Sequence, residues 1–338
     1  MSDSLKNIAE LAQRYLSDKP TFVLGSGASI ALGLPSMSEL GNALLKEVEP
    51  QDTDEETQWA AFGDSFRASG DLEQALNTVH ISESLLSQVI LKTWRLISDR
   101  DISAYGQMVS SPNFHPLANA FRYFLRVADP KLDVVTTNYD RLAEYAANSA
   151  DAQAFVGLTH GWIQKLSAND PAPARRQINI WKVHGSLDWF EMEDRRVVGL
   201  PMSRDVLPGL KPVIVTPGIT KYRQAHLEPF RTVMSQADTS LESSRVLFCI
   251  GYGFNDEHVQ PKLVTRIKQA GVPLVILTHT LTAAAKSVLF DDPPRKFLAI
   301  EKCDDGSVAY YPENLDGEHV TGEDIWALDA FMRALLEA

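Results

Sequence analysis

Residues 21–29 read Thr21-Phe22-Val23-Leu24-Gly25-Ser26-Gly27-Ala28-Ser29, an apolar run that passes directly into a glycine-rich turn. A short apolar run ended by glycine is typical of a strand buried in a parallel sheet. Glycines in that position let the backbone approach a pyrophosphate, whose charge is bound by N–H groups and a helix N-terminus. The stretch therefore predicts an α/β protein that binds a dinucleotide, with a purely structural corner as the alternative.

The spacing of the glycines narrows the class of dinucleotide-binding protein. Nicotinamide dehydrogenases carry Gly-x-Gly-x-x-Gly, and the third glycine of that pattern would fall at Ile30. The turn continues instead to Gly33-Leu34-Pro35-Ser36. This spacing argues against hydride transfer.

The rest of the chain supplies further strands and helices. Apolar runs predict strands at 132–136, 178–183, 213–215, 245–250 and 273–277, and a hairpin at 297–301 and 308–311 around Asp304-Asp305-Gly306. Apolar periodicity predicts helices at 4–17, 38–47 with Ser38 as a possible N-cap, 139–148 and 323–337. Strands that alternate with helices predict a doubly wound, Rossmann-like parallel sheet.

The stretch from about 50 to 130 has a different pattern. It shows helical periodicity at 71–98 and 114–127 and no convincing strand, which predicts a helical insertion or subdomain. We therefore expect residues 1–300 to form one α/β domain that contains this insertion. Residues 301–338 are expected to form a C-terminal hairpin and helix.

Composition and charge limit the classes of function. The chain has 338 residues, is 44% hydrophobic and carries a net charge of −12, which disfavours direct binding to nucleic acid or to an anionic membrane. Its two cysteines, Cys249 and Cys303, make neither a disulfide framework nor a four-thiolate zinc site. Residues 1–10 lack the apolar centre of a signal peptide, and no apolar stretch is long enough to span a bilayer. A cytoplasmic protein is expected.

Four polar segments follow predicted strands directly, and the glycine turn is the first of them. In a doubly wound sheet, ligands bind beyond the carboxyl ends of the strands. The second segment reads Thr136-Thr137-Asn138-Tyr139-Asp140. Asn138 offers a donor and an acceptor, and Asp140 can accept from a ribose hydroxyl or a loop amide. Capping of the following helix is the alternative role of both residues.

The third and fourth segments contain a histidine and two glycines. His184 ends a strand and can act as a proton acceptor near neutral pH, while Gly185 leaves room beside it. A structural role for the histidine is the alternative. The fourth segment is Gly251-Tyr252-Gly253-Phe254-Asn255-Asp256-Glu257-His258. Its glycines suit close approach to a sugar or base, and its three final side chains are adjacent, which disfavours a metal site.

Taken in chain order, the four segments resemble the sirtuin-like family, and specifically its bacterial NAD-consuming branch. The resemblance covers residues 20–48, 131–190 and 211–280. The phosphate loop of sirtuins resembles Gly25 to Ser29 with Gly33-Leu34-Pro35. The sirtuin Thr-Gln-Asn-Ile-Asp segment is similar to Thr136–Asp140, and the catalytic His-Gly is similar to His184-Gly185. Gly251 to Phe254 occupies the place of the later glycine-serine nucleotide loop.

The resemblance implies a role for each of these positions. Asn138 would position the nicotinamide ribose and the attacking water, Asp140 would orient the loop or bond the nicotinamide side, and His184 would accept a proton. The phosphates would lie on the Gly25–Ser29 amides, with the Ser29 hydroxyl as a further donor. The residues expected to bind NAD are Gly25, Ser26, Gly27, Ala28, Ser29, Pro35, Thr137, Gly185, Gly251, Gly253 and Asn255.

Two departures from the deacylating sirtuins set the expected reaction. The chain lacks the two Cys-x-x-Cys pairs of their zinc module, and Ser36-Met37-Ser38 stands where they carry Asp-Phe-Arg. The resemblance therefore implies NAD+ as a substrate to be hydrolysed, without zinc, in antiphage defence. It also implies a homo-oligomer and a HerA-family ATPase as partner. NAD-dependent deacylation or ADP-ribosyl transfer, and NAD sensing without turnover, stay as alternatives.

Overall fold

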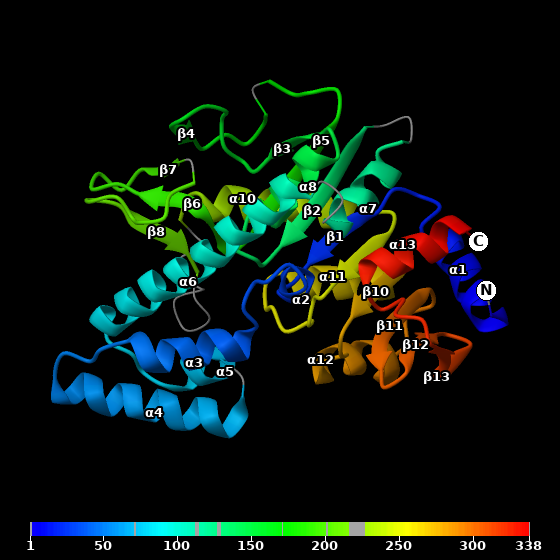
Figure 1. Cartoon of the computed structure of the whole chain (residues 1–338), viewed down its shortest axis with the longest axis horizontal. Helices are drawn as coiled ribbons and strands as arrows, with labels where there is room; N and C mark the ends of the chain where they lie inside the picture. The colour runs from blue at the N-terminus through cyan, green and yellow to red at the C-terminus, as the bar shows by residue number, and fades with distance from the viewer. Residues whose placement is uncertain are drawn as a thin grey trace.

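The computed structural model describes residues 2–70, 72–111, 115–126, 130–170, 172–200, 202–215 and 227–337. The strands of its main sheet are β1 (Thr21–Leu24), β2 (Lys131–Thr136), β3 (Gln153–Phe155), β5 (Gln177–Lys182), β9 (Leu247–Ile250), β10 (Leu274–Thr278), β11 (Phe297–Cys303), β12 (Gly306–Tyr311) and β13 (Asn314–Thr321). Within the described residues these form a nine-stranded sheet, in the order β13-β12-β11-β10-β9-β1-β2-β5-β3 (Figure 1). The strands from β11 to β3 are parallel, and β12 and β13 are antiparallel.

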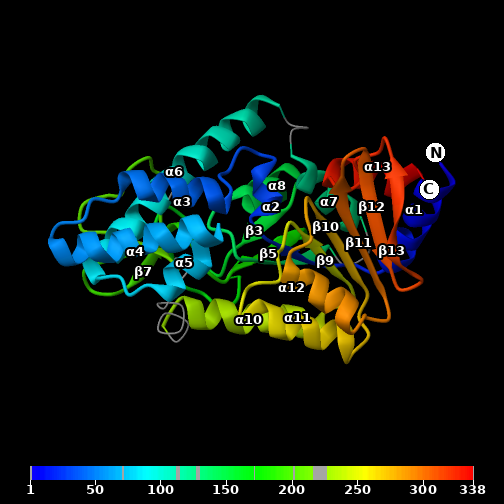
Figure 2. The same ribbon diagram turned by 90° about the horizontal axis from the view of Figure 1, so that it is seen from below.

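Successive side chains of the central strands pack on opposite faces of this sheet. In β1, Phe22 and Leu24 join the core of one face, whereas Val23 joins the core of the other. The first face is covered by α1 (Asp3–Tyr15), α7 (Pro116–Phe124), α8 (Leu142–Ser149) and α13 (Leu328–Glu337), and the second by α10 (Phe230–Ser243), α11 (Val259–Lys268) and α12 (Ala283–Lys286) (Figure 2). A sheet covered by helices on both faces confirms the predicted doubly wound α/β fold.

The helical region forms a separate core beside the sheet. It contains α3 (Met37–Glu47), α4 (Thr53–Ser69), α5 (Leu72–Thr78) and the long α6 (Glu83–Ser110), which project away from β11–β13 in Figure 1. Three aromatic rings stack in its centre. The ring centroids of Trp59 and Phe62 are 4.5 Å apart, and those of Phe62 and Phe66 are 6.1 Å apart. Helix α7 lies inside the predicted insertion range of 50–130 but packs on the first face of the sheet.

Two predicted helix boundaries differ from the structure. Ser36, and not Ser38, caps α3, because the amide of Glu39 donates to Ser36 Oγ at 3.2 Å and the Glu39 carboxylate accepts from the Ser36 amide at 2.7 Å. This reciprocal pair is a capping box. The periodic stretch 71–98 is interrupted by Ser82, whose hydroxyl caps α6 through the amide of Leu85 at 3.0 Å.

A second, antiparallel sheet lies beyond the end of β5. Its strands are β4 (Gln164–Lys165), β6 (Gly185–Glu191), β7 (Val197–Gly199) and β8 (Lys211–Ile214), in the order β4-β7-β6-β8. The predicted strand at 213–215 therefore belongs to this sheet, and not to the parallel one. Trp94 of α6 donates its indole N–H to the carbonyl of Leu187 in β6 at 2.8 Å, which ties the helical region to this sheet.

The C-terminal segment continues the main sheet. The predicted hairpin is present as β11 and β12, and the expected boundary at residue 300 lies within β11. The two ends of the chain lie side by side, where Gln13 Nε2 donates to the carbonyl of Leu335 at 2.9 Å (Figure 1). Among the described residues, no helix has the length and apolar character needed to cross a membrane.

Candidate functional site

A cavity of about 530 Å³ opens at the carboxyl ends of the central parallel strands. Its walls include all four predicted polar segments and the helical region. The predicted residues that line it are Gly25, Ser26, Gly27, Ser29, Pro35, Thr137, Asn138, Asp140, His184, Gly251, Gly253 and Asn255. Ala28 and Gly185 lie outside its lining: Ala28 borders a much smaller void behind the turn, and Gly185 faces β8.

The first and fourth segments pack directly against each other. A Cβ on Gly25 would lie 2.4 Å from the carbonyl oxygen of Gly251, and a Cβ on Gly251 would lie 2.3 Å from the amide nitrogen of Ala28. Gly251 also has a φ of +57°, a conformation that favours glycine. The glycines at these positions are therefore required by the contact between the two turns, whatever ligand the turns bind.

Gly185 meets a similar constraint in the small sheet. Its φ is +88°, and a Cβ on it would lie 2.1 Å from the carbonyl oxygen of Val213 in β8. The glycine beside His184 thus permits the pairing of β6 with β8. Its expected contact with NAD stays a prediction.

Most amides of the first turn are used within the protein. Gly25 and Gly27 donate to the carbonyls of Ile250 and Gly251, both at 3.1 Å, and Ala28 and Ser29 donate within the turn at 3.0 Å. The amide of Ser26 makes none of these bonds, and Ser26 is exposed at the cavity. Ser26 is therefore the residue of the turn best placed to donate to a bound anion.

Asn138 is held by the first turn through its amide nitrogen. Asn138 Nδ2 donates to the carbonyl of Gly25 at 2.9 Å and to Ser29 Oγ at 3.1 Å. Ser29 Oγ in turn donates to Asp140 Oδ2 at 2.8 Å. Both bonds use the nitrogen, so the side-chain oxygen of Asn138 is the atom suited to accept from water or a hydroxyl. The buried Ser29 hydroxyl already donates a hydrogen bond to Asp140, and its expected role as a phosphate donor stays a prediction.

Asp140 joins the turn to the start of α8. Its second oxygen, Oδ1, accepts from the amide of Leu142 at 3.1 Å, and burial raises the pKa of Asp140. The carbonyl of Asp140 accepts from Lys182 Nζ, and the fully buried Lys182 also donates to Glu144 at 2.8 Å. Burial raises the pKa of Glu144 to about 7. These contacts hold the backbone of the Asn138–Asp140 segment in place.

The structure brings His184 of the third segment against Asp256 of the fourth. His184 Nε2 lies 2.8 Å from Asp256 Oδ2, with the two side chains 10% and 6% exposed. The other carboxylate oxygen, Oδ1, accepts from the amides of His258 and Val259 at 3.0 and 2.9 Å and so caps α11. Asp256 is therefore shared between a helix start and the histidine.

Sequence reasoning missed two walls of the cavity. Thr278, His279, Thr280 and Thr282 line it after β10. This segment follows a predicted strand as the other four do, so the same rule applied to β10 would have found it. Ser69, Gly70 and Glu73 reach the cavity from the helical region. No strand-end pattern marks them, because only the packing of that region brings them there.

Comparisons with known proteins bear on this site. Residues 133–294, just under half of the chain, match the sequence model of the SIR2-like domain, which confirms a resemblance to the sirtuin-like family over that segment. No curated protein sequence matches the chain.

Similar solved structures include a Sir2 homologue mutant in complex with ADP ribose, with 15% identity, a TM-score of 0.47, and coverage of 100% of this chain and 97% of that one. A Sir2 homolog–NAD complex has 17% identity and a TM-score of 0.43, covering 87% of this chain and 86% of that one.

Proposed function

We propose that this protein hydrolyses NAD+ in the cavity, with the segment that matches the SIR2-like domain supplying the reactive groups. The observation that carries the proposal is that Asn138, Asp140 and His184 line one cavity together with the glycine turn. Its volume of about 530 Å³ lies within the range of sites that hold small molecules. An amide, a carboxyl and an imidazole beside an anion-binding turn suit a nucleotide substrate whose sugar bond is broken.

The proposed reaction breaks the bond between nicotinamide and ribose and adds water. Nicotinamide leaves as a neutral base with the bonding electron pair, and the water oxygen forms a bond to the ribose carbon. Asn138 accepts a hydrogen bond from this water or from a ribose hydroxyl. His184 takes the proton that the water releases and later returns it to solvent. General-base help of this kind contributes roughly 10²–10⁴ in rate.

The remaining residues bind and position the substrate. Ser26 donates to the pyrophosphate, and Pro35, Thr137, Gly251, Gly253 and Asn255 form the walls around the nucleotide. Asp140 acts through Ser29, because the bond between them fixes the side chain of Asn138. Asp140 is thus a positioning residue in this proposal.

The test is NAD+ consumption by the purified protein and by Asn138→Ala and His184→Ala. We expect His184→Ala to lose at least 10²-fold in kcat, because general-base help contributes roughly that much. Asn138→Ala should also lower kcat, because it removes the group that positions the attacking water. Exposed residues of the same types outside the cavity give the matched controls Asn148→Ala and His319→Ala, which should stay active. Full activity in both site variants, with their melting temperatures retained, would overturn the assignment.

The products separate hydrolysis from the alternative reactions. Free ADP-ribose and nicotinamide in equal amounts are the expected result. ADP-ribose attached to a protein acceptor would instead show transfer, and an acyl-ADP-ribose product would show deacylation. Binding of NAD+ without release of nicotinamide would show a sensing role.

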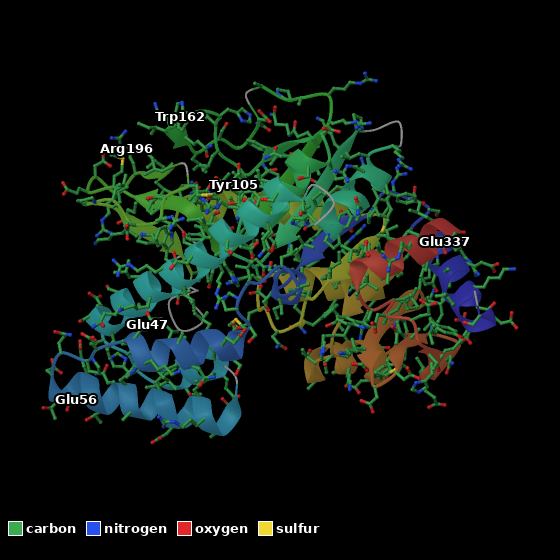
Figure 3. The ribbon with its side chains drawn as sticks, in the orientation of Figure 1. Glu47, Glu56, Tyr105, Trp162, Arg196 and Glu337 are labelled. Atoms are coloured by element: carbon green, nitrogen blue, oxygen red, sulfur yellow. The ribbon has the colours of Figure 1, made fainter. Side chains whose placement is uncertain are left out.

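We extend the proposal to a homo-oligomer that assembles with a HerA-family ATPase and depletes NAD in antiphage defence. The support is the resemblance, together with large apolar side chains at the surface. Trp162 and Ile163 are 81% and 65% exposed, and Trp162 projects from the outer edge beside β4 (Figure 3). Light scattering of the chain alone and after co-expression with such an ATPase tests this. A monomer in both samples would overturn it.

A further inference from the structure

We propose that Asp256 positions His184 by holding its proton on Nε2, so that Nδ1 is the nitrogen that accepts the proton. The two residues form an acid–imidazole pair built from the ends of two different strands, β9 and β5. The inference rests on the proposed function for its catalytic meaning, but the state of the pair can be measured without any substrate.

The contact between the two side chains sets the proton position. His184 Nε2 and Asp256 Oδ2 are 2.8 Å apart. A carboxylate oxygen has only lone pairs to offer, so an unprotonated nitrogen at this distance would be repelled. A proton on Nε2 makes the contact electrostatically attractive, although the contact lacks the angle of a hydrogen bond, and the burial of both atoms strengthens this attraction. The neutral imidazole then has its lone pair on Nδ1.

Asp256 is fixed on its other side and cannot turn away from the histidine without loss. Its Oδ1 accepts from two amides at the start of α11, and its carbonyl accepts from the amide of Gln260 at 3.1 Å. Two residues earlier, the fully buried Phe254 has a φ of +59°, which is unfavourable for a residue with a side chain. The backbone thus keeps an unfavourable conformation at Phe254, two residues before Asp256 lines the cavity.

The histidine is fixed in the same way. The carbonyl of His184 accepts from the amide of Val215 at 2.8 Å, and the next residue, Gly185, is locked against β8. With both backbones held, the imidazole and the carboxylate keep their relative position. A pair prepared in this way needs no rearrangement when a proton is transferred.

Asp256→Asn separates this role from the capping of α11. Asparagine keeps an oxygen for the amides of His258 and Val259, but its NH₂ group faces Nε2 and donates to it. This forces the proton onto Nδ1, the nitrogen required as base. In serine proteases the equivalent change leaves the geometry intact and lowers kcat by about 10⁴. Here we expect a fall of at least 10²-fold in kcat, with KM within about threefold of the original value.

The matched control is Asp52→Asn. Asp52 caps α4 through Oδ1, which accepts from the amide of Glu55 at 2.8 Å, and it does not line the cavity. It should keep full activity. A purely structural role of Asp256 predicts instead that Asp256→Asn keeps its kcat, and that result would overturn the inference.

Nitrogen-15 NMR of the histidine ring decides the proton position without NAD+. The His184 signals are assigned by their loss in His184→Gln. We expect the Nε2–H form in the native protein and the Nδ1–H form in Asp256→Asn. An Nδ1–H form in the native protein overturns the inference, and this spectrum does not depend on how the variant folds. A native Nε2–H form in a protein that never releases nicotinamide would count against the proposed function alone.

Discussion

At the scale of the residue, the hydroxyl of Ser29 connects two of the proposed site residues. It accepts from Asn138 and donates to Asp140, and it is buried. A buried hydroxyl with both capacities used is costly to remove, because its partners lose their bonds in a low-dielectric environment. The neighbouring Ser26 is exposed and outside this network.

Ser29→Ala should therefore lower the free energy of unfolding by about 1–3 kcal/mol, because it leaves Oδ2 of Asp140 without its donor. It should also lower kcat, because Asn138 loses one of its two acceptors. Ser26→Ala is the matched variant, expected within about 0.5 kcal/mol of the native protein and with its kcat retained, because Ser26 is exposed and outside the network. Urea unfolding and steady-state kinetics measure both effects. Equal stability of the two variants would contradict the network.

His115 gives a pH dependence at the same scale. It is 2% exposed, and burial lowers its pKa from 6.5 to about 4. The unfolded chain therefore binds more protons than the folded one between these pH values, so the free energy of unfolding falls as the pH falls through this range. The full effect of His115 is about 3 kcal/mol.

His115→Gln should flatten this part of the stability curve. The measurement is urea unfolding of both proteins at several pH values from 7.5 to 4.5, compared as a difference so that other groups cancel. The gap between the native protein and the variant should narrow or reverse as the pH falls. Parallel curves would show that His115 does not titrate between the folded and unfolded states in this way.

At the scale of the element, the two glycine turns act as one unit. The turn after β1 and the turn after β9 approach so closely that a Cβ on Gly25 or Gly251 would collide with the backbone of the other. Parallel β1 and β9 are hydrogen-bonded neighbours, which brings their carboxyl ends to the same point. The first glycine turn is thus supported by the segment that carries Asp256.

Gly251→Ala should cost more than its backbone conformation alone explains. A side chain in the left-handed region costs about 1–2 kcal/mol. The collision with the Ala28 amide at 2.3 Å adds to this and displaces the first turn. Gly271→Ala is the control, because Gly271 has a φ of +64° and no atom within 4 Å of its Cβ position. Thermal unfolding and NAD+ hydrolysis should both be affected more strongly at 251 than at 271, and equal losses would contradict the turn contact.

At the scale of the whole molecule, a buried ion pair joins the helical region to the sheet. Asp101 of α6 accepts from the guanidinium and backbone amide of Arg141 and from the hydroxyl of Tyr145. Asp101 is fully buried, and Arg141 directly follows Asp140. The ion pair therefore holds the helical region, which contributes Glu73 to the cavity, next to the Asn138–Asp140 segment.

Asp101→Ala should lower the free energy of unfolding by about 3–5 kcal/mol, because it leaves the guanidinium of Arg141 buried without its partner. Replacing both residues together, as Asp101→Leu with Arg141→Met, should recover part of this loss. Urea unfolding of the single and double variants measures the coupling. A cost below about 1 kcal/mol for Asp101→Ala would show that the pair does not fasten the two regions.

The amino-acid sequence by itself determined the parallel sheet and the end of it that carries the cavity. Apolar runs such as Phe22-Val23-Leu24 are buried on both faces, and parallel strands place their carboxyl ends on one edge. Asn138 and His184 could therefore be assigned to one site before any contact was known. Strand β6 is not among the predicted strands, and its pairing with β8 identifies it.

Only the tertiary structure decided which of these side chains touch. Strands β5 and β9 are separated by β2 and β1 in the sheet, so their ends are about 14 Å apart at the usual strand spacing. Asp256 nevertheless lies 2.8 Å from His184, because it stands in the connection between β9 and α11 and not in the strand itself. Glu73 reaches the cavity through the packing of the helical region, and the buried Lys182 at the end of β5 donates to the carbonyl of Asp140. The periodicity of apolar residues indicates on which face of a strand or helix a side chain lies. Contacts between side chains of different segments depend instead on the strand order and on the packing of turns that are far apart in the chain.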